Sequence, residues 1–302
     1  MRLSFAILLC CGFFASIPAS LGEDQPNIMS AADLAKFPNP APDVRIAYGD
    51  MALQFADLRL PTGPGPHPVM ILIHGGCWLS QYDISHIGKL ADAFAGNGIA
   101  TWVVEYRRVG DAGGGWPGTF QDIAHAADHL LNVAQAYSLD TTRVIAAGHS
   151  AGGHLALWLA ARGQFKDHPA FLSANPVQLK GVLALAPAPD LTLLHETGVC
   201  DNVIDKLMGG SPQDFPDRYA IGSATELVPI DLPQLLVIGR YDSNWGEVGR
   251  RHFEAAKAAN DDIQLIDAAE SGHFEMIDPD SSTWPLVLDA AFQLLGMTSE
   301  EH

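Results

Sequence analysis

The stretch "RVIAAGHSAGGHLALWLA", residues 143–160, decides the fold. An apolar run typical of a buried strand leads into a Gly-x-Ser-x-Gly pattern centred on Ser150, and a run typical of a buried helix follows. A serine on such a sharp turn takes a strained backbone conformation, and the flanking glycines let strand and helix approach closely. We therefore predict that the Ser150 hydroxyl lies above a sheet as a nucleophile; an ordinary helix-capping serine is the alternative.

The rest of the chain alternates between apolar strand patterns and helical patterns. We expect strands at 44–49, 52–60, 68–76, 99–107, 143–150, 180–190, 234–242 and 262–270, and helices near 85–96, 119–137, 202–208 and from about 151, 247 and 283. Strands that are apolar throughout are buried on both faces, which predicts an α/β fold with a mostly parallel central sheet flanked by helices. The first two strands, with Gly49 and Asp50 between them, predict an edge hairpin.

The amino terminus predicts an exported protein. Residues 1–22, "MRLSFAILLCCGFFASIPASLG", combine one basic residue, a short apolar run and small residues, as in a cleavable signal peptide. An uncleaved membrane anchor is the alternative. We expect a secreted or periplasmic protein that has no membrane attachment after cleavage.

The expected mature chain consists of a lead-in over 23–43 and a single domain over 44–298. It keeps 16 basic and 35 acidic residues, a formal charge of −19, which disfavours nucleic acid as a partner. Within the domain, residues 190–231 contain several prolines and one helical run, and such a long segment is typical of a short cap over a site. A solvated insertion without a role in the site is the alternative.

A serine nucleophile needs a base and an acid that orients it. Among 12 histidines, His273 follows the last expected strand, where it could reach Ser150, and Asp242 follows the preceding strand. Asp190 is the reserve candidate for the acid. The chain order Ser150, Asp242, His273 is that of the α/β-hydrolase fold.

The oxyanion of a tetrahedral intermediate needs backbone amides as donors. One is expected from Ala151, directly after the nucleophile, and others from the "HGGCW" loop after an earlier strand, which offers the amides of Gly75, Gly76 and Cys77. We place His149, Trp78, Trp116 and Trp245 as candidate walls of the substrate pocket, although each tryptophan could equally be core.

Several segments resemble a known family. "HGGCW" is similar to the H-G-G-x-W loop of kynurenine formamidases and related feruloyl and carboxyl esterases, and "GHSAGGHLA" resembles their nucleophile segment. "EYRRVGDAGGGWPGTFQDI", "GGSPQDFPDRY" and "GHFEMIDP" extend the resemblance over roughly 45–297. It implies an α/β-hydrolase catalytic domain with the same triad, and an oxyanion hole of Gly76, Cys77 and Ala151. The hormone-sensitive-lipase pattern H-G-G-G is absent from the sequence, which disfavours lipase-like substrates.

We expect a serine carboxylesterase that acts on a small-molecule ester without a cofactor or metal. The first alternative is an arylformamidase, which an exported location disfavours, and the second is a peptidase of the prolyl-oligopeptidase type, although this chain has no room for a propeller domain. A metal hydrolase is disfavoured because His125 and His129 lack the glutamate of a zinc motif. A non-catalytic binding protein would usually have lost part of the triad. The sequence leaves the oligomeric state open.

Cys77 and Cys200 are the two cysteines of the expected mature chain. A disulfide between them is compatible with export. A nucleophilic Cys77 would need a base of its own, and the available base is assigned to Ser150. We expect the Cys77 side chain to be incidental and its backbone amide to matter.

Overall fold

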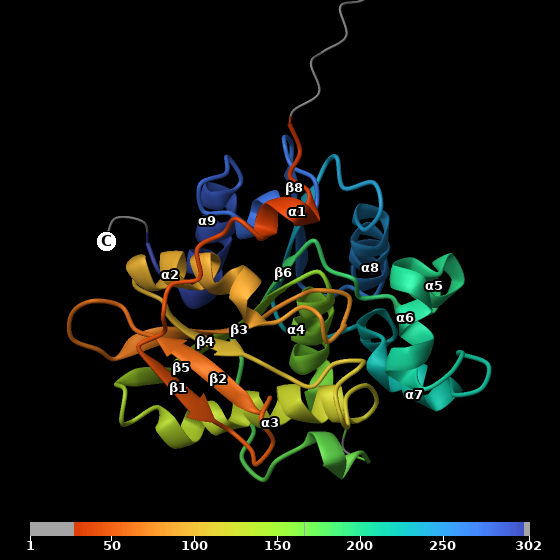
Figure 1. Cartoon of the computed structure of the whole chain (residues 1–302), viewed down its shortest axis with the longest axis horizontal. Helices are drawn as coiled ribbons and strands as arrows, with labels where there is room; N and C mark the ends of the chain where they lie inside the picture. Colours follow the sequence, from red (N-terminus) through yellow and green to blue (C-terminus); the bar gives the residue numbers. More distant parts are fainter. Residues whose placement is uncertain (1–26, 166, 299–302) are drawn as a thin grey trace, which may run out of the picture.

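Eight strands form one sheet in the computed structural model, which describes residues 27–165 and 167–298 (Figure 1). In sheet order they are β1 (Val44–Ala47), β2 (Phe55–Arg59), β4 (Ala100–Val104), β3 (His67–Ile73), β5 (Leu139–His149), β6 (Val182–Leu185), β7 (Gln234–Gly239) and β8 (Ile263–Ala268). β2 pairs antiparallel with β1 and β4, and every other pair is parallel. The predicted mostly parallel α/β sheet is confirmed, whereas the signal peptide predicted over 1–22 lies outside the described residues.

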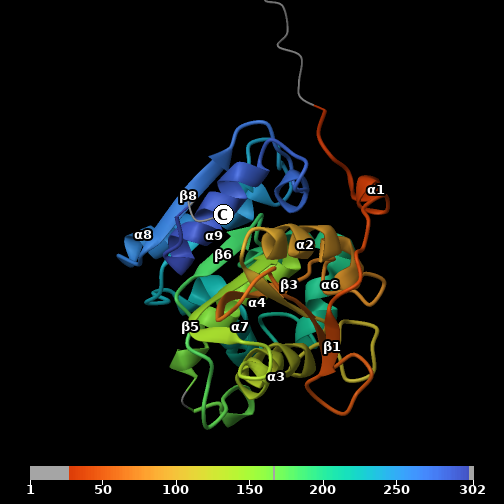
Figure 2. The same cartoon turned by 90° about the vertical axis from the view of Figure 1, so that its left-hand side faces the viewer.

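The sheet separates two apolar cores, as the alternation of side chains along β3 shows. Val69, Ile71 and Ile73 pack on one face with α3, α4 and α8, and Met70 and Leu72 pack on the other with α2 and α9. The helices lie correspondingly on opposite sides of the sheet (Figure 2). Their bounds are Gly88–Gly96 for α2, Gly118–Val133 for α3, Ala151–Ala161 for α4, Gly246–Ala258 for α8 and Trp284–Leu295 for α9.

The β1–β2 hairpin forms at the sheet edge, but its connection is longer than the predicted pair Gly49 and Asp50. Ala47 pairs with Phe55, and the residues between them form the connection. The Tyr48 hydroxyl donates a hydrogen bond to the buried backbone carbonyl of the residue after β4 (2.6 Å). The Tyr48 amide still donates to the Gln54 carbonyl oxygen at 2.9 Å, so the turn itself lies within residues 49–53. A local strand pattern does not reveal where this turn begins and ends.

The segment 190–231 contains three α-helices in place of the single run predicted. They are α5 (Leu191–Thr197), α6 (Val199–Met208) and α7 (Pro216–Gly222), and they gather at one side of the molecule (Figure 1). α5 and α7 each span only seven residues. Helices this short show too little periodicity to be identified from sequence, so capping signals are the main guide.

Candidate active site

Ser150 lies at the turn between β5 and α4 with a backbone conformation of φ 55° and ψ −118°. This is a strained conformation for a residue with a side chain. A Cβ at Gly148 would lie 2.2 Å from the carbonyl oxygen of Gly152, and a Cβ at Gly152 would lie 2.1 Å from that of Ile73. Neither position can therefore carry a side chain without moving the turn, and the serine is held above the sheet by packing on both sides.

His273 and Asp242 meet beyond the ends of β8 and β7. The Nδ1 atom of His273 lies 2.7 Å from Oδ2 of Asp242, and the other carboxylate oxygen of Asp242 accepts the Trp245 amide at 3.0 Å. The Asp242 side chain is 2% exposed and that of His273 is 11% exposed. The pairing fixes which ring nitrogen faces Asp242 and leaves Nε2 of His273 free to act on another group.

Asp190, the reserve candidate for the acid, is committed to other contacts. Its Oδ1 atom accepts the Leu193 amide at 2.9 Å and caps α5, while its Oδ2 atom lies 3.1 Å from the Arg251 guanidinium. Asp190 therefore stabilises the start of α5, and Asp242 is the carboxylate that contacts His273.

The "HGGCW" loop follows β3 and lies beside the serine turn. A Cβ at Gly75 would lie 2.7 Å from the His149 carbonyl oxygen, and Gly76 has a φ of +99°. Within the described part of the chain, no hydrogen bond to a backbone or side-chain acceptor uses the amides of Gly75, Gly76 or Cys77. Ala151 is the first residue of α4, so its amide has no acceptor within the helix. These free donors border Ser150, as an oxyanion site requires.

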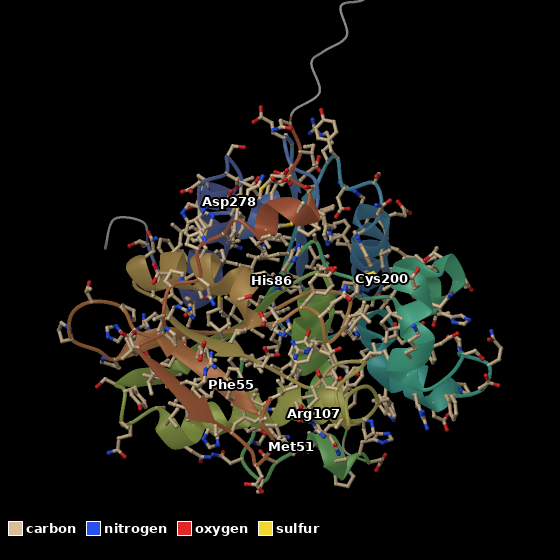
Figure 3. All side chains as sticks on the ribbon, in the orientation of Figure 1. Met51, Phe55, His86, Arg107, Cys200 and Asp278 are labelled. Atoms are coloured by element: carbon tan, nitrogen blue, oxygen red, sulfur yellow. A yellow bond between two sulfur atoms is a disulfide. The ribbon has the colours of Figure 1, made fainter. Side chains whose placement is uncertain are left out.

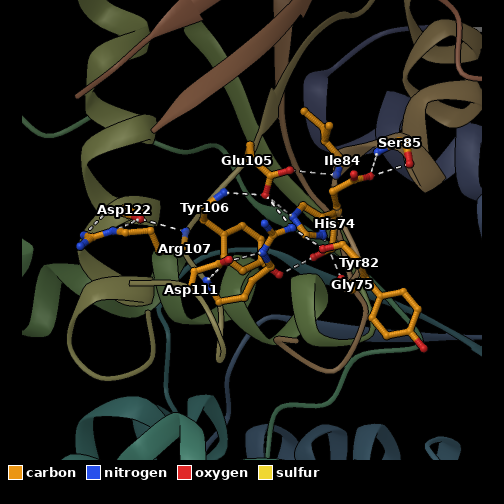
Figure 4. A network of polar contacts seen from close by, with 12 residues as sticks. His74, Gly75, Tyr82, Ile84, Ser85, Glu105, Tyr106, Arg107, Asp111 and Asp122 are labelled. Carbon is orange, nitrogen blue, oxygen red and sulfur yellow. Dashed lines mark hydrogen bonds and ion pairs between the residues drawn. The ribbon is translucent and has the colours of Figure 1, made fainter. Parts of the chain in front are cut away.

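A buried ionic network, which sequence reasoning missed, supports this loop (Figure 4). His74 contacts the Gly75 carbonyl oxygen through Nδ1 at 2.8 Å and Glu105 Oε1 through Nε2 at 3.0 Å. Glu105 also lies 3.1 Å from the Arg108 guanidinium and accepts the Ile84 amide at 3.1 Å. Burial raises the pKa of the Glu105 carboxyl, but His74 and Arg108 outweigh it and hold that pKa below its ordinary value. Glu105 and Arg108 both lie in the segment "EYRR", but a short charged run gives no sign in the sequence that it is buried against His74.

A disulfide joins Cys77 to Cys200, with the two Cα atoms 6.4 Å apart. It links the "HGGCW" loop to the start of α6, within the segment 190–231; Cys200 is labelled in Figure 3. The expectation that the Cys77 side chain is incidental is therefore wrong. The two cysteines have a sequence separation of 123, so no local sequence pattern indicates that they pair.

A cavity of about 220 Å³ contains Ser150 and His273. Its other lining residues are Ala31, Leu34, Gly76, Cys77, Tyr82, His86, His149, Cys200, Trp245 and Phe274. None of these described lining residues is an aspartate, glutamate, lysine or arginine. Burial, followed by the charge of His74, lowers the pKa of His86 to about 3, and burial also holds the pKa of His149 well below its ordinary value. At neutral pH these two histidines therefore add no charge to the wall.

The cavity corrects two of the four predicted wall residues. His149 and Trp245 line it, and the Trp245 ring stacks on His273 with centroids 5.5 Å apart. Trp78 is instead completely buried in the core, and Trp116 packs between Phe120 and Phe171. Trp78 belongs to the large apolar core on the face of α3 and α4, and Trp116 packs against that core. The sequence alone could not separate these roles.

Sequence comparison places the chain in a family. A profile of the BD-FAE family matches residues 56–244, which include Ser150 and Asp242 and end before His273. The chain belongs to the BD-FAE family. The isoprenylcysteine alpha-carbonyl methylesterase ICME of Arabidopsis thaliana is 26% identical over 216 residues, which cover 65% of this chain and 48% of that protein. The chain thus spans about half the length of this curated relative.

Solved structures share the fold of this BD-FAE chain. Esterase B from Lactobacillus rhamnosis superposes with a TM-score of 0.74 at 22% identity, covering 88% of this chain and 90% of that one. A truncated carbohydrate esterase from gut microbiota gives a TM-score of 0.73 at 18% identity, over 85% and 98% of the two chains. The fold is that of the α/β hydrolases. In the described part of the chain, no helix has the length and apolar character needed to cross a membrane.

Proposed function

We propose that this protein hydrolyses neutral carboxylic esters through a Ser150-His273-Asp242 triad and an acyl-enzyme intermediate. The observation that carries the proposal is the shared cavity: the strained Ser150, the His273 ring paired with Asp242 and the free loop amides all border it. Membership of the BD-FAE family and the methylesterase activity in the relative's name support ester hydrolysis as the reaction.

The proposed chemistry begins when Ser150 Oγ attacks the ester carbonyl carbon and Nε2 of His273 takes its proton. Negative charge develops on the carbonyl oxygen and is stabilised by the amides of Gly76, Cys77 and Ala151. The C–O bond to the alcohol then breaks, and His273 returns the proton to the leaving alcohol. Water attacks the acyl-enzyme by the same route and releases the acid. In the described residues Ser150 Oγ makes no hydrogen bond, so the proposed chemistry requires it to come within hydrogen-bond distance of His273 Nε2 in the substrate complex.

The cavity supports a neutral substrate group of limited size. Its volume of about 220 Å³ is small for a ligand pocket, and no full charge lines its described walls. An anionic or cationic group would lose hydration there without gaining a partner. Trp245, Phe274 and Leu34 favour an apolar or aromatic group next to the ester.

We further propose that the protein is exported. The sequence of residues 1–22 and the Cys77–Cys200 disulfide support this, since disulfides persist in oxidising compartments. Mass spectrometry of the protein recovered from culture medium or periplasm tests the proposal. The expected amino terminus lies near residue 23, and recovery of an uncleaved chain in the membrane fraction would contradict it.

The substrate proposal is tested by initial rates on a panel of uncharged esters and amides. Short acyl esters of p-nitrophenol, feruloyl esters and acetylated sugars represent the proposed class, and N-formylkynurenine and a proline-containing peptide represent the two alternatives. We expect a higher kcat/KM for at least one ester than for either amide substrate. A preference for N-formylkynurenine would establish the arylformamidase alternative, and a preference for the peptide would establish the peptidase.

A further inference from the structure

The segment before the sheet, residues 28–34, reaches the cavity of Ser150; we call it the N-terminal strap. Its last turn is α1 (Ala31–Leu34), and both Ala31 and Leu34 line the cavity. The strap precedes the region 56–244 that the BD-FAE profile matches. The strap therefore contributes to the cavity from outside the matched region, as His273 and Phe274 also do.

Glu275 fastens the strap to the loop that carries His273. One carboxylate oxygen of Glu275 accepts the Met29 amide, and the other accepts the Gly272 amide at 2.8 Å. Glu275 is 7% exposed; its hydrogen bond to Gly272 is buried, and its hydrogen bond to Met29 is partly buried. Burial strengthens such hydrogen bonds because the local dielectric constant is low. Ile28 packs against the same loop, since a Cβ at Gly272 would lie 2.3 Å from its Cγ2 atom.

The strap also holds its own shape. The amide and hydroxyl of Ser30 donate to Asp33 at 2.9 and 2.8 Å and cap the turn of α1. Leu34 is half-buried and packs at the edge of the core formed by α2 and α9. A capped turn, a buried carboxylate and an apolar anchor together place Leu34 at the cavity in a defined position.

We propose that the N-terminal strap is a specificity wall of the ester-binding cavity, in which Leu34 limits the length of the substrate's apolar group. Glu275 acts as a positioning residue that keeps the strap in register with the His273 loop. The proposal rests on the ester hydrolysis proposed above. Because Leu34 presents only carbon to the cavity, the group it selects is an alkyl or aryl chain of the acid or the alcohol, and longer chains are excluded by contact.

The test compares kcat/KM for p-nitrophenyl acetate, butyrate, hexanoate and octanoate, and for acetate esters of alcohols of increasing length. Leu34→Ala should raise the ratio of the longest to the shortest substrate about tenfold or more in at least one series, the range expected for a few methylenes in an apolar pocket. Leu34→Phe should lower the same ratio. Leu131→Ala is the matched control: Leu131 is also half-buried, but it lies on α3 and lines a separate surface hollow.

Glu275→Gln keeps the side-chain volume but replaces one acceptor oxygen with a donor that faces an amide. We expect faster hydrogen exchange in residues 28–34 and a specificity ratio shifted in the direction of Leu34→Ala. Faster exchange with an unchanged ratio would make Glu275 merely structural and would overturn its positioning role.

The outcomes separate the two proposals. Wild-type protein that hydrolyses none of the esters would overturn the proposed function itself. Active wild-type protein whose ratios are the same in Leu34→Ala, Leu34→Phe and Leu131→Ala would overturn the strap proposal and leave ester hydrolysis standing.

Discussion

Removal of the Cys77–Cys200 disulfide should destabilise the protein strongly, because the bond closes a long loop. The cysteines are 123 residues apart, and the chain-entropy relation for a loop of that length gives about 5 kcal/mol of stabilisation at 25 °C. In a domain of this size, the loss of that stabilisation in the Cys200→Ser variant corresponds to a fall in Tm of roughly 10–20 °C. Circular dichroism melts of mature wild type and Cys200→Ser, prepared under oxidising conditions, measure it.

Dithiothreitol supplies the control for this experiment. Because Cys10 and Cys11 lie in the expected signal peptide, the mature wild type has one reducible bond, so reductant should lower its Tm toward that of Cys200→Ser. The variant itself should be insensitive. Ester turnover should fall as well, because the disulfide holds the loop that presents the Cys77 amide. The decrease in kcat should not exceed the factor of about 10²–10³ that complete loss of one oxyanion donor causes. Two free thiols in unreduced, denatured wild type, or equal melting temperatures, would refute the reasoning.

Three further predictions follow from the site and the core. Asp242→Asn should lower kcat by about 10⁴-fold with little change in Tm, because the amide favours the wrong His273 tautomer; near-normal kcat would contradict this. Gly76→Ala should lower kcat/KM at least tenfold, because its new Cβ would lie 2.4 Å from that of Tyr82, and unchanged initial rates would argue against the loop's role. Burial lowers the pKa of His252 to about 4. Between about pH 6.5 and pH 4 this histidine is therefore protonated in the unfolded chain but neutral in the folded chain, so the free energy of unfolding decreases as the pH falls. Urea titrations at several pH values measure how the free energy of unfolding changes with pH. His252→Gln should reduce this pH dependence by up to about 1.4 kcal/mol per pH unit, whereas the control His125→Gln, at an exposed position, should not. The same pH dependence in wild type and His252→Gln would contradict the assignment.

The sheet, and the meeting of Asp242 with His273 in the candidate site, could be predicted from local signals. The apolar strands identify the sheet, and the glycines around Ser150 mark a turn whose geometry the structure places at a left-handed φ. Asp242 and His273 follow neighbouring strands, and parallel strands bring their carboxyl ends to one edge of the sheet. Position along the chain was sufficient for these residues.

The remaining features depend on contacts between distant segments. Trp78 and Trp245 are alike in sequence terms, but one is completely buried and the other lines the cavity, a difference set by the three-dimensional packing around each. Leu34 belongs to a four-residue helix, too short for any periodic signal, and is held at the site partly by the distant contact of Glu275 with Met29. Nothing in the sequence near Met29 or Glu275 indicates that these two residues are in contact.

The most direct test of the central claim is covalent labelling of the mature enzyme with a fluorophosphonate, followed by peptide mapping and turnover of p-nitrophenyl acetate. We expect a single adduct on Ser150, loss of turnover in proportion to labelling, and neither labelling nor turnover in Ser150→Ala. Substantial turnover by a folded Ser150→Ala variant, or an adduct on a different residue that abolishes activity, would contradict it.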